Sequence, residues 1–194
     1  MDNRYILFKI SLPGMRQFLL VIWETIQVAV ISLAVVLVVR NFIIQPFFVD
    51  GSSMVPNFQD GDYLIIDELT FRFREPQRGE VIVFKFPQNE SSYFIKRVIG
   101  LPGDTVQVKN GVVNVFNQDN PEGVQLSENY LISKTPGDIQ MTLQTGEYFV
   151  LGDNRTMSYD SRSWGVLPAK EIVGLVRLRL WPINSAKAIT APQY

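Results

Sequence analysis

An almost entirely apolar run near the start of the chain constrains the fold more than any other feature of the sequence. Residues 18–39 read FLLVIWETIQVAVISLAVVLVV, with Glu24 as the one charged residue. As an α-helix this run is about 33 Å long, which matches a bilayer hydrocarbon core of roughly 30 Å. It is longer than the apolar region of a cleaved signal peptide, and no small-x-small site follows it. We predict an uncleaved transmembrane anchor; the alternative is a buried helix of a soluble protein.

The charges flanking this run indicate its orientation. They are Arg4, Lys9 and Arg16 before the run, opposed by Asp2, and Arg40 after it. The more basic flank of a membrane helix normally stays in the cytoplasm. The sequence therefore predicts a cytoplasmic segment at residues 1–17, an anchor at 18–40 and an extracytoplasmic remainder. The start of the chain has no Ser/Arg-rich transit segment, which favours a bacterial plasma membrane over a thylakoid.

Beyond the anchor, short strand-like runs replace the helical pattern. These runs are 63–67, 81–86, 93–99, 105–108, 112–116, 147–151 and 172–180. Turn sequences separate them, and Asn110-Gly111 between two runs is a strong hairpin signal. Many short strands are typical of a sandwich or a barrel-like set of sheets. The sequence predicts a mainly β fold: an N-terminal transmembrane helix followed by a β-rich domain at 41–194, with an exposed polar excursion at about 117–140.

Two residue types are absent from the sequence, and this excludes several kinds of active site. Without Cys there is no disulfide, thiol nucleophile or thiolate metal site, and without His there is no Ser-His-Asp triad or ordinary zinc site. The 18 Lys+Arg and 19 Asp+Glu give a net charge of −1, which argues against a nucleic-acid-binding surface. If the domain is a hydrolase, a group other than His must act as its base.

A serine-containing turn shortly after the apolar run is the first candidate for chemistry. Residues 50–56 read DGSSMVP; Gly51 permits an unusual backbone turn and Pro56 stiffens the exit. A serine on such a turn can present its hydroxyl and its own backbone N–H to a carbonyl group, as a nucleophile with an oxyanion donor requires. Ordinary turn chemistry explains the same residues.

Lys96, in the run YFIKRVI, is the second candidate. Strand alternation places Lys96 on the face of Phe94 and Val98, and Arg97 on the opposite face. Apolar neighbours can desolvate a lysine and lower its pKa from about 10.4 toward the range in which a general base works. The alternative is a lysine whose ammonium reaches solvent at a sheet edge.

The polar segment 152–165, which reads GDNRTMSYDSRSWG, is the third candidate. Asp160 and Arg162 can form a charge-assisted pair that fixes the loop, and Ser158 can orient a nearby amine. A solvated surface loop has the same composition.

Together these segments resemble the type I signal peptidases, membrane-anchored enzymes that remove signal peptides from exported proteins. The resemblance runs in order over about residues 18–182, through the anchor, GSSMVP, GDYLIIDE, RGEVIVFKFP, FIKRVIGLPGD and GDNRTMSYDSRSWG. It implies a catalytic domain of coiled antiparallel sheets and a Ser/Lys dyad that works through an acyl-enzyme. The chain length is similar to that of compact members with one anchor.

The resemblance also implies roles for individual residues. Ser53 matches the nucleophile and Lys96 the general base. The supporting positions are Ser158, which orients the lysine, Asp160 and Arg162, which form a structural ion pair, and Arg97 and Asp153, which support the same loop. The family's specificity for small residues at the first and third positions before the cut implies shallow pockets. The matching substrate-binding positions are Phe47, Val49, Gly51, Met54 and Ile95.

Three positions depart from the family pattern. Thr156-Met157 replace the usual Asp-Asn of the polar loop, which affects the expected local geometry. Gly51 stands where some members have a serine that donates to the oxyanion, so the Ser53 backbone N–H is the expected main donor. Asn57 replaces a common Thr, with no expected loss of a catalytic role.

The implied partners are preprotein signal peptides and the lipid bilayer, with the secretion translocon as a functional neighbour. No metal, organic cofactor or nucleic acid is expected, and the sequence leaves the oligomeric state open. A self-cleaving repressor-type peptidase uses a similar dyad, but it has a partner domain and no N-terminal anchor. The alternative from another class is a membrane-tethered β-domain that binds exported peptides without cutting them, and the presence of Lys96 argues against it.

Overall fold

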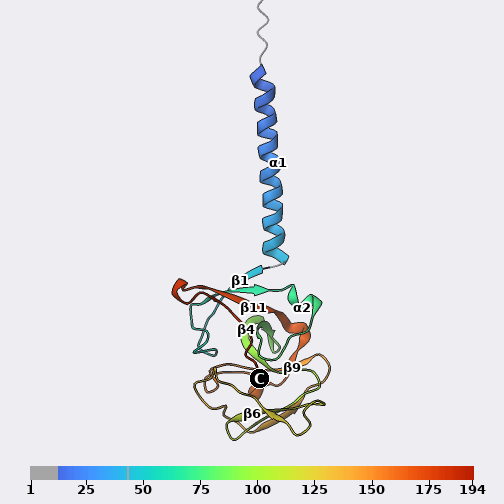
Figure 1. The fold of residues 1–194 in the computed structure, drawn as a ribbon, viewed down its shortest axis with the longest axis vertical. Coiled ribbons are helices and arrows are strands. Elements are labelled where there is room, and N and C mark those ends of the chain that lie inside the picture. The colour runs from blue at the N-terminus through green and yellow to red at the C-terminus, as the bar shows by residue number, and fades with distance from the viewer. Residues whose placement is uncertain (1–12, 43) are drawn as a thin grey trace, which may run out of the picture. The chain divides into compact units, whose positions relative to one another are not determined.

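The computed structural model of the chain describes residues 13–42 and 44–194. The chain divides into two compact units, Met1–Asn41 and Phe42–Tyr194 (Figure 1). Most of the predicted cytoplasmic segment, including Arg4 and Lys9, lies outside the described residues.

The first unit contains one long helix, α1, which spans Pro13–Phe42 and has 30 residues. Its part Gly14–Leu37 has a mean hydropathy of 2.2, and all of its residues are exposed. The buried core helix of a soluble protein would be covered by its neighbours. The helix is long and apolar enough to cross a membrane, and its exposed apolar surface is consistent with the predicted anchor.

The second unit is built around an eight-stranded antiparallel sheet with the order β1-β2-β11-β3-β4-β9-β10, in which β12 also pairs with β11. The strands are β1 (Ile44–Phe48), β2 (Tyr63–Asp67), β3 (Val81–Phe86), β4 (Asn89–Gly100), β9 (Glu147–Leu151), β10 (Leu167–Pro168), β11 (Ile172–Trp181) and β12 (Lys187–Ala188). Short helices connect them: α2 (Thr70–Phe73), α3 (Ser161–Trp164), and the 3-10 turns η1 (Ala169–Glu171) and η2 (Ile183–Ser185).

A second, four-stranded antiparallel sheet follows β4 and has the order β7-β6-β5-β8. Its strands are β5 (Thr105–Lys109), β6 (Val112–Phe116), β7 (Val124–Gln125) and β8 (Ile139–Thr142). Asn110 and Gly111 have φ values of 54° and 85°, which form the predicted two-residue hairpin turn between β5 and β6. Within this unit, β6 lies toward one end and β1 toward the other (Figure 1).

The predicted mainly β fold is confirmed, and the predicted strands all occur with boundaries shifted by few residues or none, except that β4 begins at Asn89 rather than at residue 93. Strands β1, β7, β8, β10 and β12 were not predicted, and β1 contains Pro46, a residue that is rare in central strands. The structure explains this residue because β1 is an edge strand, where proline is tolerated.

The segment predicted as an exposed excursion, residues 117–140, is only partly exposed. It contributes β7 and the first residues of β8 to the small sheet. Leu126 is 4% exposed and joins the apolar core of that sheet, while Thr135 is 1% exposed and accepts a hydrogen bond from Arg155.

One of the three apolar cores of the second unit supports the candidate site. It contains Val49, Met54, Phe58, Leu64, Ile66, Val81, Val83 and Val176. These residues come from the connection between β1 and β2 and from strands β2, β3 and β11. Burial of such side chains contributes about 1.5–3 kcal/mol each, so this core fixes the loop that follows β1 against the sheet.

Candidate active site

Ser53 lies in the connection between β1 and β2, on the turn predicted from DGSSMVP. Gly51 has φ 104°, a left-handed conformation that residues with a side chain rarely adopt, and its N–H donates to Asp60 Oδ1 at 2.8 Å. The side chain of Met54 is fully buried and anchors the turn in the core. Backbone N–H of Asn154 donates to the carbonyl oxygen of Ser53 at 2.9 Å. The turn is therefore held from both sides, with the Ser53 hydroxyl at its tip.

Lys96 lies on β4 and reaches the Ser53 hydroxyl. Its Nζ donates to Ser53 Oγ at 2.7 Å and to the backbone oxygen of Ile95 at 2.9 Å. Nζ also lies 5.3 Å from the centre of the Phe94 ring. The structure thus brings together the two residues predicted as nucleophile and base.

The environment of Lys96 changes its acidity. The residue is 4% exposed, and no carboxylate forms a salt bridge with it among the described residues. Burial lowers the pKa of Lys96 from its ordinary value of 10.5 to about 8, while the carboxylates of Asp160 and Asp153 act in the opposite direction. A substantial fraction of this amine is neutral in mildly alkaline solution and can accept a proton.

Ser158 lies close to the Ser53 turn, but the predicted contact with Lys96 is not formed in this structure. Its Oγ is buried and has no hydrogen-bond partner among the described residues. A Cβ atom placed on Gly152 would lie 2.2 Å from Ser158 Oγ and 2.4 Å from the backbone oxygen of Ser53. Gly152 therefore allows the close approach of both residues, and the orienting role of Ser158 stays a prediction.

Asp160 and Arg162 form a two-point ion pair that closes the polar loop. Arg162 Nε and Nη2 each donate to an Asp160 oxygen at 2.8 Å, and Arg162 Nη1 reaches the backbone oxygen of Pro136. Asp160 is fully buried and also accepts from the Gly152 N–H at 3.1 Å. It caps α3 at the same time. One carboxylate thus links the two ends of the loop that contains Ser158.

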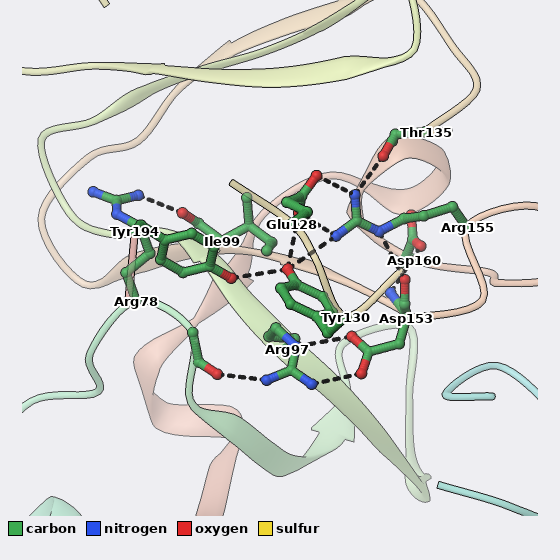
Figure 2. A network of polar contacts seen from close by, with 12 residues as sticks. Arg78, Arg97, Ile99, Glu128, Tyr130, Thr135, Asp153, Arg155, Asp160 and Tyr194 are labelled. Carbon is green, nitrogen blue, oxygen red and sulfur yellow. Dashed lines mark hydrogen bonds and ion pairs between the residues drawn. The ribbon is translucent and has the colours of Figure 1, made fainter. Parts of the chain in front are cut away.

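Arg97, which follows Lys96 on β4, forms a second buried ion pair with Asp153 (Figure 2). Arg97 Nε and Nη2 donate to the two Asp153 oxygens at 2.8 and 2.5 Å, and Nη1 donates to the backbone oxygen of Gly79 at 2.8 Å. Asp153 also accepts from Asn57 Nδ2 at 2.9 Å. No supporting role was predicted for Asn57, because a polar residue in a turn does not reveal a partner 96 positions away.

A cleft of about 410 Å³ runs past the Ser53 hydroxyl and the Lys96 ammonium. Four of the predicted substrate-binding residues line it, namely Phe47, Val49, Gly51 and Ile95. Met54 does not line this cleft, because its side chain points into the core, where its sulfur accepts the Asp153 N–H at 3.4 Å. The placement of Met54 at the substrate is corrected to one beneath the turn.

The cleft has further walls that were not predicted, formed by Phe48, Tyr93, Phe94, Met157 and Tyr159. The rings of Phe47 and Tyr93 lie 5.6 Å apart. Tyr93 precedes Ile95 by two residues on one strand, and this spacing could have indicated it. No group of three or more Asp or Glu residues that could hold a metal ion occurs among the described residues.

Comparison with known proteins identifies the family. The sequence profile of the family described as "Signal peptidase, peptidase S26" matches residues 22–181. A signal peptidase I of Leptolyngbya laminosa is 37% identical over 179 residues, which cover 87% of this chain and 84% of that protein. A signal peptidase IB of Staphylococcus aureus is 32% identical over 170 residues, or 81% and 88% of the two chains.

A crystal structure of a signal peptidase I from Enterococcus faecalis V583 is 33% identical, with a TM-score of 0.46 over 53% of this chain and 97% of that one. The family profile alone covers most of the chain, from within α1 to the end of β11. The chain therefore belongs to the peptidase S26 family of signal peptidases.

Proposed function

We propose that this protein is a membrane-anchored serine endopeptidase that removes signal peptides from exported preproteins, with Ser53 as nucleophile and Lys96 as general base. The single observation that carries the proposal is the 2.7 Å contact between Lys96 Nζ and Ser53 Oγ at the wall of a cleft. Membership of the signal peptidase family gives the substrate class. The low exposure of Lys96 gives the reason why an amine can serve as the base.

In the acylation step, neutral Lys96 takes the Ser53 hydroxyl proton and Ser53 Oγ bonds to the carbonyl carbon of the scissile peptide. The tetrahedral intermediate collapses when its C–N bond breaks, and the Lys96 ammonium gives its proton to the leaving amine. The signal peptide is then held as an ester on Ser53. The two residues supply nucleophile, base and acid, so this mechanism requires no metal or cofactor.

The negative oxygen of the intermediate needs a hydrogen-bond donor. The Ser53 N–H is suited to this role, because within the described part of the chain it donates no hydrogen bond. It belongs to the nucleophile itself and lies on a turn whose backbone is fixed by Asn154. In the second step Lys96 takes a proton from water, the hydroxide attacks the ester, and Ser53 Oγ leaves and regains its proton.

Strand β4 offers an open edge beside the dyad. Residues Tyr93–Lys96 pair with β3, whereas the pairing of β4 with β9 begins only at Arg97. Within the described chain, the other edge of this stretch thus has backbone groups available to an extended peptide. A preprotein can add there as a strand, with its cleavage site at Ser53.

The apolar walls around this edge account for small-residue specificity. Phe47, Val49 and Ile95 line the cleft next to Ser53. Their bulk limits the depth of the pockets, so that alanine fits and larger side chains collide with the wall. In this proposal the N-terminus is cytoplasmic, α1 crosses a bacterial plasma membrane, and the β domain cleaves preproteins as they leave the translocon.

The test is the cleavage of a preprotein with an Ala-x-Ala site by the purified full chain in detergent, with the cut located by mass spectrometry. Ser53→Ala and Lys96→Ala are compared with the exposed Ser127→Ala and Lys109→Ala as matched controls. Cleavage after the last Ala that only the first pair abolishes supports the proposal. Cleavage by Lys96→Ala would show that Lys96 is not the base. Signal-peptide binding without cleavage by the folded wild type would support the peptide-binding alternative.

A further inference from the structure

Tyr130 links three parts of the candidate active site from behind, although it belongs to the segment 117–140, outside the sequence blocks that resemble the family. Figure 2 shows Tyr130 between Arg97 on one side and Arg155, Glu128 and Tyr194 on the other. Its hydroxyl, its ring and its backbone oxygen each hold a different partner. None of these atoms lines the cleft that contains Ser53 and Lys96.

The hydroxyl of Tyr130 fixes the residue in place. It donates to Glu128 Oε1 at 2.9 Å and accepts from Arg155 Nη2 at 3.3 Å. Since Tyr130 donates its one hydroxyl proton to Glu128, the Tyr194 hydroxyl is the donor in the 2.8 Å hydrogen bond between the two tyrosines. Burial raises the pKa of Tyr130 well above its ordinary value, so the hydroxyl keeps this proton.

The ring of Tyr130 covers the guanidinium of Arg97. The Arg97 Cζ atom lies 4.3 Å from the ring centre, a cation–π contact that shields the Arg97–Asp153 pair from water. Arg97 directly follows Lys96 on β4. The position of the ring therefore affects both the direction of this part of the strand and the charge that neutralises Asp153.

The backbone oxygen of Tyr130 holds the other side of the site. It accepts from Asn57 Nδ2 at 3.1 Å, and the same amide donates to Asp153 Oδ2 at 2.9 Å. Asn57 lies four residues after Ser53, and Asp153 immediately precedes Asn154, whose N–H binds the Ser53 carbonyl. The turn with Ser53, the strand with Lys96 and the polar loop thus meet at one tyrosine.

We propose that Tyr130 is a positioning residue of the peptidase: through Arg97, Asn57 and Asp153 it holds Lys96 and Ser53 at their contact distance and keeps the Arg97 charge on Asp153. The inference rests on the proposed function, because it assigns Tyr130 to the reaction of that dyad. It gives segment 117–140 a role in the reaction in addition to its place in the small sheet.

Loss of the ring has a defined electrostatic consequence. The charged groups around Lys96 are Asp153 and Asp160, their partners Arg97 and Arg162, and Asp50 in the wall of the cleft. Without the ring, the Arg97 guanidinium is no longer held on Asp153, so the Asp153 carboxylate is neutralised less completely. The charge of Asp153 raises the pKa of Lys96, and a less neutralised carboxylate raises it further, so a higher pH is needed to produce the neutral base.

The experiment measures kcat and KM for an Ala-x-Ala preprotein between pH 6 and 9.5, using the full chain in detergent. Tyr130→Leu removes the ring and hydroxyl, whereas Tyr130→Phe keeps the ring over Arg97. Tyr148→Leu is the matched control, since Tyr148 is a 1% exposed tyrosine in a separate apolar core. Melting temperatures are recorded for all variants, because each of these changes lowers stability.

For Tyr130→Leu we expect the acidic limb of kcat to move up by about one pH unit, which is about a tenfold loss at pH 7, with KM unchanged. Tyr130→Phe and Tyr148→Leu are expected to keep the wild-type limb. An unchanged limb in a folded Tyr130→Leu overturns the inference, and so does an equal shift in Tyr148→Leu. If Tyr130→Leu does not fold, Asn57→Ala tests the same link and should shift the limb in the same direction; an unchanged limb there overturns it.

The same assay separates this inference from the proposed function. If the wild type does not cleave preproteins, or if Ser53→Ala retains activity, the proposed function fails. If the wild type cleaves and needs both Ser53 and Lys96, but its pH profile is indifferent to Tyr130 and Asn57, only the positioning role fails.

Discussion

Lys96 Nζ and Ser53 Oγ lie 2.7 Å apart although the two residues are separated by 43 positions in the chain. Ser53 lies on a turn that follows an edge strand, and Lys96 lies on a strand near the middle of the sheet. Between them in the sheet run β2, β11 and β3, so the contact depends on the whole sheet being formed. The contact also has consequences for pH dependence, stability and specificity.

The cleavage rate should rise with pH and level off near the pKa of Lys96. Because burial lowers this pKa to about 8, only about a tenth of the amine is neutral at pH 7. We expect kcat/KM for an Ala-x-Ala preprotein to increase about tenfold per pH unit below 8. Lys96→Arg is the control, since arginine stays charged and should be inactive throughout. A rate that is constant from pH 6 to 9 would contradict Lys96 as the base.

The buried amine should also make the protein less stable in neutral solution than in alkaline solution. In the folded chain Lys96 loses its proton near pH 8, whereas in the unfolded chain it does so near 10.5, so the unfolded state binds more protons between these values. The free energy of unfolding therefore rises with pH across this window. Lys96→Met has no amine that must be buried in its charged form. This variant should therefore be more stable than the wild type at pH 7, by up to about 3 kcal/mol.

Urea unfolding of both proteins at pH 7, 8.5 and 10.5 measures this difference. The difference in free energy of unfolding between the two proteins should become smaller as the pH rises from about 8 to about 10.5. A gap that does not change with pH would mean that the amine is solvated in the folded protein.

Removal of the Asp153 carboxylate should destabilise the domain strongly. Asp153 is fully buried and pairs with Arg97, so Asp153→Asn leaves a buried guanidinium without its counter-charge. Breaking such a pair costs about 3–5 kcal/mol. Asp119→Asn changes an exposed carboxylate and should alter stability by less than about 0.5 kcal/mol. Chemical unfolding of the two variants gives the comparison, and equal values would exclude the pair as a major support.

The walls of the cleft should set the size of the residue before the cut. Ile95→Ala removes bulk next to Ser53, so substrates with Val at that position should be cleaved better relative to Ala. In an apolar pocket, a size difference of about one methylene group changes relative kcat/KM by about 10–200-fold. Val124→Ala, at a half-exposed valine on β7, is the control and should leave the ratio unchanged. An unchanged ratio in Ile95→Ala would place the pocket elsewhere.

The sequence predicted the parts of this protein that depend on local pattern. The apolar run, the strands and the Asn110-Gly111 hairpin follow from periodicity and turn chemistry, and the motifs around Ser53 and Lys96 pointed to residues that the structure brings together. It missed the contacts of Asn57 with Asp153 and of Tyr130 with Arg155, because these partners lie 96 and 25 positions away and no local pattern encodes them. The resemblance to the family placed Met54 at the substrate, whereas the turn directs this side chain into the core.

Gly152 is the position at which the smallest substitution should do the most damage to activity. It joins β9 to the polar loop, and its N–H and carbonyl oxygen are both fixed, by Asp160 at 3.1 Å and by Arg155 Nε at 2.9 Å. A Cβ atom there would lie 2.4 Å from the backbone oxygen of Ser53 and 2.2 Å from Ser158 Oγ. The Ser158 hydroxyl can rotate away, but Ser158 Cβ at 2.5 Å and the Ser53 backbone oxygen can move only with their own backbone segments.

Gly152→Ala must therefore push apart the turn with Ser53 and the loop with Ser158, which disturbs the contact between Ser53 and Lys96. A misplacement of about 1 Å at a reacting group can cost about a hundredfold in rate, so we expect kcat to fall by at least that factor. The matched control is Gly14→Ala, where a Cβ atom meets nothing within 4 Å. Cleavage of the Ala-x-Ala preprotein by both variants, with circular dichroism to establish folding, is the measurement. Full activity in a folded Gly152→Ala would show that the nucleophile turn tolerates movement, and that the short contact between Ser53 and Lys96 does not limit the rate.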